Sequence, residues 1–261
     1  RWGRATYGGT GAGRGGAMVG GGGSGAAMLG GDGAGFRGRG GAGSGVAGSW
    51  VAVADGIGAG PAGREAAQVA VGLAQVVLGA GELTEADVYR LFDSAYVALR
   101  PWWVQERGGG TTLTVAAVSR TGLVIGVVGD SPAYVDFGAG FELVTKPKRS
   151  HLLKEWLGSE DRPQPWIGLW PWADHEIRGV IVTSDGVNPH EVRSLAADGS
   201  AAEIVTALRS ARSLDGDDAS AAVAVRTRGP QEKKWGGTRG REPTEARDTG
   251  GRGREGGGHG G

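Results

Sequence analysis

Apolar residues recur at helical spacing in several stretches of the chain. In residues 63–81 they occupy every third or fourth position until the glycines near the end of the stretch, and in 84–100 they do so until Pro101. Thr84 and Asp87 have the spacing of a capping box at the start of the second stretch. These patterns predict two helices, the second ended by Pro101. Three further helices are predicted at 151–158, 188–197 and 200–213.

Shorter apolar runs, bounded by glycine and polar residues, predict strands. Residues 111–119 and 123–130 form one hairpin, and 132–145 form a second with Gly138–Gly140 at its turn. Single strands are predicted at 49–54, 180–184 and 217–227. Two early helices, a block of strands, two late helices and a last strand do not alternate as in a doubly wound fold. The order therefore favours an α+β arrangement in which helices cover sheets.

A carboxylate stands at the point where each of four buried strands begins or ends. Asp55, Asp130 and Asp185 follow apolar runs, whereas Asp217 and Asp218 precede one. If these strand ends lie at one edge of the sheets, the carboxylates converge and repel one another unless a cation neutralises them. Oxygen ligands suit hard ions such as Mg²⁺ and Mn²⁺. Taken singly, each of these carboxylates is better explained as part of a turn, and only the four together favour a metal site.

The motifs around these carboxylates resemble a known family. They read, in chain order, DGIGAG, GGTTLT, GDSPAY, SDG and DDAS. Their order and separation, over residues 49–227, resemble the metal-dependent protein phosphatases of the PPM or type 2C family, in particular its bacterial members. The resemblance implies a four-layer αββα sandwich with two packed sheets. It also implies two Mn²⁺ or Mg²⁺ ions, with a third in bacterial members, and hydrolysis of phosphoserine or phosphothreonine in proteins by a metal-activated water.

The same resemblance assigns roles to individual residues. By position, Asp55 resembles the carboxylate that bridges both ions, and Gly56 would offer its backbone carbonyl. Asp185 and Asp217 resemble carboxylates that hold one of these ions. Asp130, together with Asp185, resembles the pair that binds the third ion. Asp55 and Asp185 are accordingly the expected catalytic residues.

The N-terminal part of the family pattern is eroded. Members of the family carry an arginine that binds the substrate phosphate, followed by an acidic residue. Asp32 is the only carboxylate upstream of Asp55 and thus the candidate for that acid, but no arginine stands a few residues before it. Asp32 is otherwise explained as a polar residue in a glycine-rich tract. This leaves two alternatives: a working phosphatase, or a pseudophosphatase that binds a phosphoprotein or a kinase without catalysis.

Composition sets the limits of the folded region. The 55 glycines crowd into residues 8–60 and 236–261, so we expect a Gly-rich low-complexity segment at 1–47, a phosphatase domain at 48–228 and a disordered Gly/Arg-rich tail at 229–261. In a third alternative these Gly-rich ends bind partners and the domain is only a scaffold. The chain has no cysteine, which excludes disulfides, thiolate catalysis and cysteine-ligated zinc among its 261 residues.

Charge and hydropathy indicate the surroundings of the protein. Lysine plus arginine and aspartate plus glutamate both total 28, so a nucleic-acid partner is not expected. No run of 18 apolar residues predicts a membrane span, and we expect a cytoplasmic monomer. Phosphoproteins are the expected partners, with a serine/threonine kinase as a second candidate. Histidines 151, 175 and 190 lack metal-ligand spacing and are expected to be structural, and tryptophans 156, 166, 170 and 172 are expected to pack in the core or a flap, with a protein-docking surface as the alternative.

Overall fold

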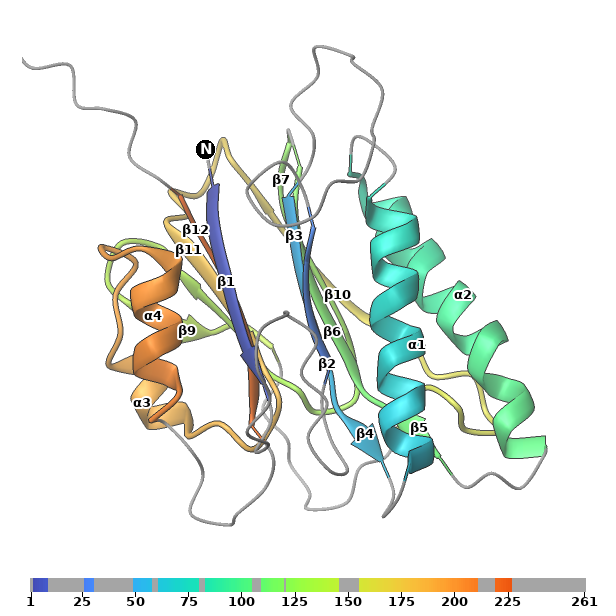
Figure 1. Ribbon diagram of the computed structural model, residues 1–261. Helices are drawn as coiled ribbons and strands as arrows, with labels where there is room; N and C mark the ends of the chain where they lie inside the picture. Colours follow the sequence, from blue (N-terminus) through green and yellow to red (C-terminus); the bar gives the residue numbers. More distant parts are fainter. Residues whose placement is uncertain are drawn as a thin grey trace, which may run out of the picture. The chain divides into compact units, whose positions relative to one another are not determined.

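The computed structural model divides the chain into two units, Arg1–Thr227 and Arg228–Gly261, and every residue described below belongs to the first (Figure 1). The described residues are 2–8, 26–30, 49–57, 61–79, 83–104, 109–119, 121–145, 155–210 and 219–226. The expected tail at 229–261 and most of the expected low-complexity segment at 1–47 therefore lie outside the described residues.

The described strands form two five-stranded antiparallel sheets, here called sheet A and sheet B, and one short pair. Sheet A runs in the order β1 (Trp2–Gly8), β12 (Ser220–Arg226), β11 (Gly179–Thr183), β8 (Ala133–Asp136) and β9 (Phe141–Leu143). Sheet B runs in the order β10 (Trp166–Pro171), β7 (Gly122–Val128), β6 (Leu113–Val118), β3 (Ser49–Ala54) and β2 (Ala26–Gly30). The short pair joins β4 (Gly56–Ile57) to β5 (Gly110–Thr111).

Four helices accompany the sheets within the described residues. They are α1 (Pro61–Leu78), α2 (Glu85–Val104), α3 (Pro189–Arg193) and α4 (Ala201–Leu208). The predicted helices near these positions, the two hairpins and the chain order of helices and strands are confirmed. The capping box of Ser200 and Glu203 is also present at the start of α4.

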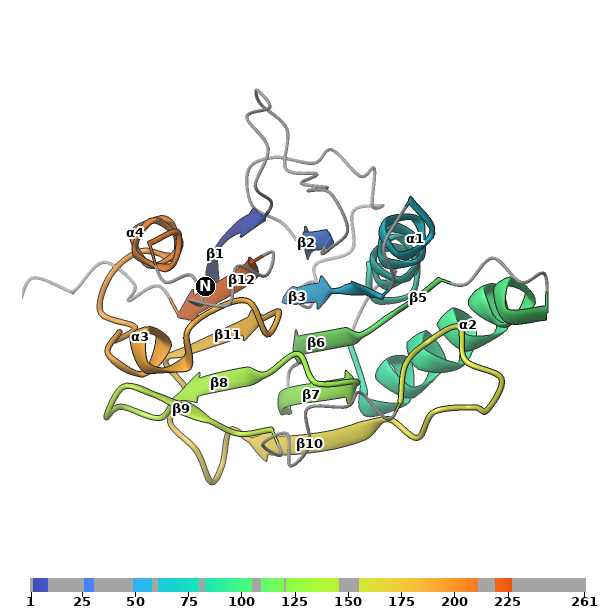
Figure 2. The same cartoon turned by 90° about the horizontal axis from the view of Figure 1, so that it is seen from below.

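Alternate residues along the central strands enter different cores. Val51 of β3 and Val182 of β11 lie in the core between the two sheets. Ala52 lies in the core that sheet B shares with α1 and α2, and Ile181 lies in the core that sheet A shares with α3 and α4. Because neighbouring residues of a strand point to opposite faces, this alternation builds four layers. The predicted αββα sandwich is thus confirmed (Figures 1 and 2).

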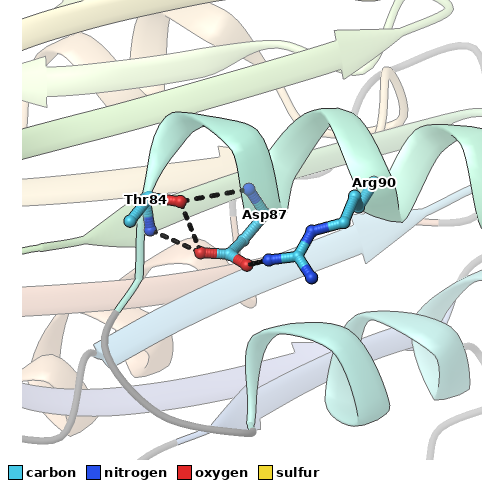
Figure 3. Close-up of polar contacts among 3 residues, drawn as sticks. All are labelled: Thr84, Asp87 and Arg90. Atoms are coloured by element: carbon cyan, nitrogen blue, oxygen red, sulfur yellow. Dashed lines mark hydrogen bonds and ion pairs between the residues drawn. The ribbon is translucent and has the colours of Figure 1, made fainter.

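The start of α2 shows how local sequence fixes a helix end. The backbone N–H and the hydroxyl of Thr84 donate to Asp87 Oδ2 at 2.8 and 2.6 Å. In return, the N–H of Asp87 donates to Thr84 Oγ1 at 3.3 Å, and the Arg90 guanidinium pairs with the same carboxylate (Figure 3). This arrangement satisfies donors that the first turn of a helix leaves without partners.

We expect Asp87→Ala to lower the free energy of unfolding by about 1 kcal/mol at pH 7, a typical loss for a helix cap. Partial burial raises the pKa of Asp87, but the Thr84 hydrogen bonds and the Arg90 charge outweigh it and lower the pKa overall. The stabilising contribution is therefore complete above the ordinary pKa of 3.8 and is lost as pH falls through the lowered value. Urea unfolding from pH 7 to pH 3 should show the gap between wild type and variant closing on acidification. A gap that does not depend on pH would contradict this account.

Two expectations about helices are wrong. Helix α2 does not end at Pro101 but continues to Val104. The proline falls in the last turn, four residues after Val97, whose side chain is 69% exposed, so water can reach the carbonyl that loses its partner. Residues 155–158, the described part of the predicted helix 151–158, are not helical. Leu157 instead exchanges two backbone hydrogen bonds of 2.9 Å with Thr111.

Three strands of sheets A and B were missed by the sequence analysis. β1 and β2 lie in the glycine-rich segment, and each supplies an edge strand to one sheet. β10 lies in the tryptophan-rich stretch and pairs with β7 at the other edge of sheet B. Among the described residues, no helix combines the length and the apolar character needed to span a bilayer.

Candidate metal centre

The strand pairings bring the carboxylate motifs to one edge of the sandwich. In sheet B, Val53 near the end of β3 pairs with Thr114 at the start of β6, and Leu113 pairs with Val128 at the end of β7. In sheet A, Val182 near the end of β11 pairs with Ala133 at the start of β8. The turn from β7 to β8 crosses from one sheet to the other at this edge. In Figure 1, β4 and β5 lie towards the bottom of the picture, and Figure 2 shows the fold from below.

Asp55 is held through its backbone. Its N–H donates to Thr112 Oγ1 at 3.0 Å, and its carbonyl accepts from the Thr112 N–H and from Thr111 Oγ1, both at 2.9 Å. Three hydrogen bonds from two consecutive threonines therefore fix the position from which the side chain projects. Asp55 and the following Gly56 are partly buried.

Asp130 stands in the tight turn between β7 and β8. Gly129 has a φ of +99°, a conformation that glycine adopts without strain, and a Cβ on it would lie 2.6 Å from Thr112 Cγ2. After Asp130, Ser131 Oγ lies 2.7 Å from Thr112 Oγ1, and Ser131 O accepts from Thr114 Oγ1 at 2.6 Å. The turn that carries Asp130 is thus joined directly to the threonine that holds Asp55.

Asp185 follows β11 at the same edge. Two residues before it, the N–H of Thr183 donates to Pro132 O at 3.0 Å, which ties the end of β11 to the turn of Asp130. Ser184 exchanges hydrogen bonds with Ser220 at the start of β12: Ser184 N–H donates to Ser220 O, and Ser220 N–H donates to Ser184 Oγ, both at 2.9 Å. Asp185 itself is exposed to solvent.

The structure thus brings together the backbone positions of Asp55, Gly56, Asp130 and Asp185. Asp32 and Asp217 lie outside the described residues. Among the residues that are described, no group of three or more His, Cys, Asp or Glu side chains is close enough to hold a metal ion. The donors that are described are carboxylates and a backbone carbonyl, which is the chemistry that Mg²⁺ and Mn²⁺ require. These donor types therefore fit such ions.

Hydroxyl residues are the part of this edge that the sequence analysis missed. Thr111, Thr112, Thr114, Ser131 and Ser184 are all buried. Every one of them makes a hydrogen bond to the backbone or to another hydroxyl at this edge. The signal in the sequence was the serine next to the carboxylate in GDSPAY and SDG, together with the threonines of GGTTLT.

Three of the tryptophans and one histidine of the described residues pack against other side chains, whereas His190 is exposed. Trp166, Trp170 and Trp172 pack against the core between the sheets, and Trp172 Nε1 donates to Ser119 O at 3.0 Å. The ring centroid of His175 lies 5.5 Å from that of Phe137, with the two ring planes tilted by 45°. Core packing is thus confirmed for these tryptophans. His151 lies outside the described residues.

Comparisons place the fold among known proteins. A family model described as protein phosphatase 2C matches residues 39–224, which is more than half of the chain. The structure of the serine/threonine phosphatase Stp1 from Staphylococcus aureus matches with a TM-score of 0.64 and 19% identity, covering 86% of this chain and 95% of that chain. The S. agalactiae serine/threonine phosphatase matches with a TM-score of 0.61 and 14% identity, covering 87% and 100%. The catalytic domain of the serine/threonine phosphatase PstP, in complex with two manganese ions, matches with a TM-score of 0.60 and 18% identity, covering 86% and 97%. No curated protein matches the chain.

Proposed function

The chain belongs to the protein phosphatase 2C family, and we propose that it is a metal-dependent hydrolase of phosphoserine and phosphothreonine in proteins. One observation carries the proposal beyond family membership. The motifs of Asp55, Asp130 and Asp185 come from both sheets, and a continuous set of short hydrogen bonds joins them at one edge. Turns that had no common role would not need to be tied to one another in this way.

We propose that Asp55, the carbonyl of Gly56, Asp130 and Asp185 hold two Mn²⁺ or Mg²⁺ ions and a third, together with Asp32 and Asp217. When bound, such ions lower the pKa of a coordinated water and offset charge on phosphoryl oxygens. The residues of the chain contribute position and charge: Asp55 is fixed by the two threonines, and the exposed Asp185 faces solvent, from which a phosphorylated side chain arrives.

The pseudophosphatase alternative is not favoured. Its motivation is the eroded N-terminal motif around Asp32, which lies outside the described residues. The described part of the centre retains Asp55, Gly56, Asp130 and Asp185 at one edge, together with the hydrogen bonds that hold their strands. The presence of all four of these candidate ligand positions supports a catalytic role.

Removing divalent metal should abolish the activity reversibly. We expect EDTA to reduce the rate of p-nitrophenyl phosphate hydrolysis by at least about 100-fold. The chain has no cysteine that could act as a nucleophile once the metal-activated water is lost. Mn²⁺ added in excess over the chelator should restore the rate. Unchanged turnover in EDTA would overturn the proposed metal dependence. A rise in melting temperature with Mn²⁺, without any turnover, would favour the inactive binding module instead.

The remaining features of the proposal concern the setting of this activity. We propose phosphoproteins as substrates, a serine/threonine kinase as a partner, and a cytoplasmic monomer as the working form. We also propose a domain that ends near residue 228, followed by a separate tail. The division of the chain after Thr227 supports that boundary.

A further inference from the structure

We propose that the buried hydroxyl pair Thr112–Ser131 is a positioning device that sets the spacing between Asp55 and Asp130, and thereby the affinity of the centre for divalent metal. This inference rests on the proposed function, and it assigns a role to two residues that carry no metal ligand themselves. Both hydroxyls lie at the junction between the two carboxylate motifs.

The pair is closed off from solvent. Thr112 is 2% exposed and Ser131 is 1% exposed, and their hydroxyl oxygens are 2.7 Å apart. Losing a hydrogen bond at a site closed to solvent is unfavourable, so removing either hydroxyl leaves the other with one partner fewer and no water to replace it. A valine or an alanine would fill similar space here without needing a hydrogen-bond partner.

Each member of the pair is rigidly attached to one carboxylate motif. Thr112 Oγ1 also accepts the N–H of Asp55 at 3.0 Å, so the same oxygen contacts both motifs. Ser131 directly follows Asp130, and its carbonyl is held by Thr114 Oγ1 at 2.6 Å. The methyl group of Thr112 also packs against the same turn, because Cγ2 lies 2.6 Å from the position that a Cβ on Gly129 would take. Moving either hydroxyl therefore moves Asp55 relative to Asp130.

A similar pair of hydroxyl residues at the other end of β6 and β7 provides a matched control. Ser119 Oγ and Thr121 Oγ1 lie 3.0 Å apart in the turn between β6 and β7, and Ser119 Oγ also contacts the backbone of Gly122. This turn joins the ends of β6 and β7 that lie away from the carboxylates. Loss of the Ser119 hydroxyl perturbs a buried hydrogen bond without touching the candidate centre.

The test is the dissociation constant for Mn²⁺, measured on the full chain by electron paramagnetic resonance of free Mn²⁺. We expect Thr112→Val and Ser131→Ala each to weaken Mn²⁺ binding by about 10-fold or more, which is the usual loss when a residue that orients a metal ligand is removed. Valine keeps the methyl group and the shape of Thr112 but not its hydroxyl. Thr112→Ser keeps the hydroxyl, so its dissociation constant for Mn²⁺ should stay within about 3-fold of the wild-type value, well below the loss expected for the other two variants. Ser119→Ala should bind as wild type does.

The double variant adds a sign of direct coupling. Either single change already breaks the pair. The dissociation constant of the double variant Thr112→Val with Ser131→Ala should therefore be no higher than that of the single variant with the higher constant. Circular dichroism and the melting temperature without metal establish that each variant is folded. Should Thr112→Val fail to fold, Ser131→Ala and Thr112→Ser decide the matter.

Two results would overturn the inference while the proposed function stands. One is wild-type affinity for Mn²⁺ in folded Ser131→Ala and Thr112→Val. The other is an equal loss in Ser119→Ala, which would indicate general loosening of the sandwich. If wild type binds no Mn²⁺ and hydrolyses no phosphate ester, the proposed function fails, and this inference fails with it.

Discussion

Replacing Asp185 by asparagine is expected to lower Mn²⁺-dependent hydrolysis of p-nitrophenyl phosphate by at least about 100-fold, more than is lost when a residue behind a metal ligand is removed. Asparagine keeps the shape of the side chain but not its charge, and a hard cation is held mainly by charged oxygens. Since Asp185 is exposed, the substitution should leave the fold intact. Steady-state rates over a Mn²⁺ titration would measure the effect, because weakened metal binding shifts the titration as well as lowering its plateau.

The matched control is Asp174→Asn. Asp174 is also exposed and lies in the turn after β10, where its N–H donates to Pro171 O. Pro171 pairs with Gly122 at the start of β7, and this end of the strands of sheet B lies away from Asp55. This variant removes one negative charge at the other end of the fold and should hydrolyse the substrate at the wild-type rate. Equal rates for wild type and Asp185→Asn would remove Asp185 from the centre and leave it as a turn residue.

Gly63→Ala and Gly72→Ala are expected to change stability in opposite directions, although both place a methyl group on α1. A Cβ at Gly63 would lie 2.6 Å from the carbonyl oxygen of Ile57, whereas a Cβ at Gly72 meets nothing within 4 Å. The first contact is with backbone, which cannot rotate away. We expect a loss of about 2–3 kcal/mol or more for Gly63→Ala, at the upper end of overpacking. Gly72→Ala should gain about 0.5–1 kcal/mol from helix propensity.

Denaturant unfolding measures both changes, and Gly63→Ala has a second expected effect. Gly56 sits on the same contact, because its own Cβ would lie 2.4 Å from the Gly63 carbonyl carbon. Pushing α1 away would therefore move β4, which carries the proposed carbonyl ligand. Weaker Mn²⁺ binding in the folded fraction of Gly63→Ala is the expected consequence. A gain in stability from both substitutions would show that α1 and β4 are free to separate.

The elements that the sequence predicted are those in which local rules and packing agree. Trp50 through Ala54 alternate between two buried cores, so their apolar run is continuous, and the carboxylate after it marks the end of burial. The cap at Thr84 and the hairpin turn around Gly138–Gly140 follow rules that operate within a few residues. The position of the candidate site followed because antiparallel pairing and one crossover place such strand ends together.

The elements that were missed depend on distant partners. The stretch of β10 contains Gly168 and Pro171, which disfavour a strand, but Trp166 and Trp170 pack against the core between the sheets and its backbone pairs with β7. Leu157 lies in an apolar run that favours a helix, yet its pairing with Thr111 holds it extended. The contact of Thr112 with Ser131 could not be predicted from spacing, because the two residues are 19 positions apart in the chain.

The pairing of β1 with β12 has a consequence for the order in which the chain folds. Trp2 stands opposite Arg226, so the register of this pair joins the two ends of the described chain. Closing such a long loop carries a large entropic penalty, and contacts of this kind form late. During synthesis on a ribosome, sheet B can assemble around β3, β6 and β7 before β12 emerges. Sheet A remains incomplete until then, because β12 lies between β1 and β11. Because Ser184, which precedes Asp185, is hydrogen-bonded to Ser220 of β12, the end of the sandwich that gathers the carboxylates would then be completed only after β12 has emerged.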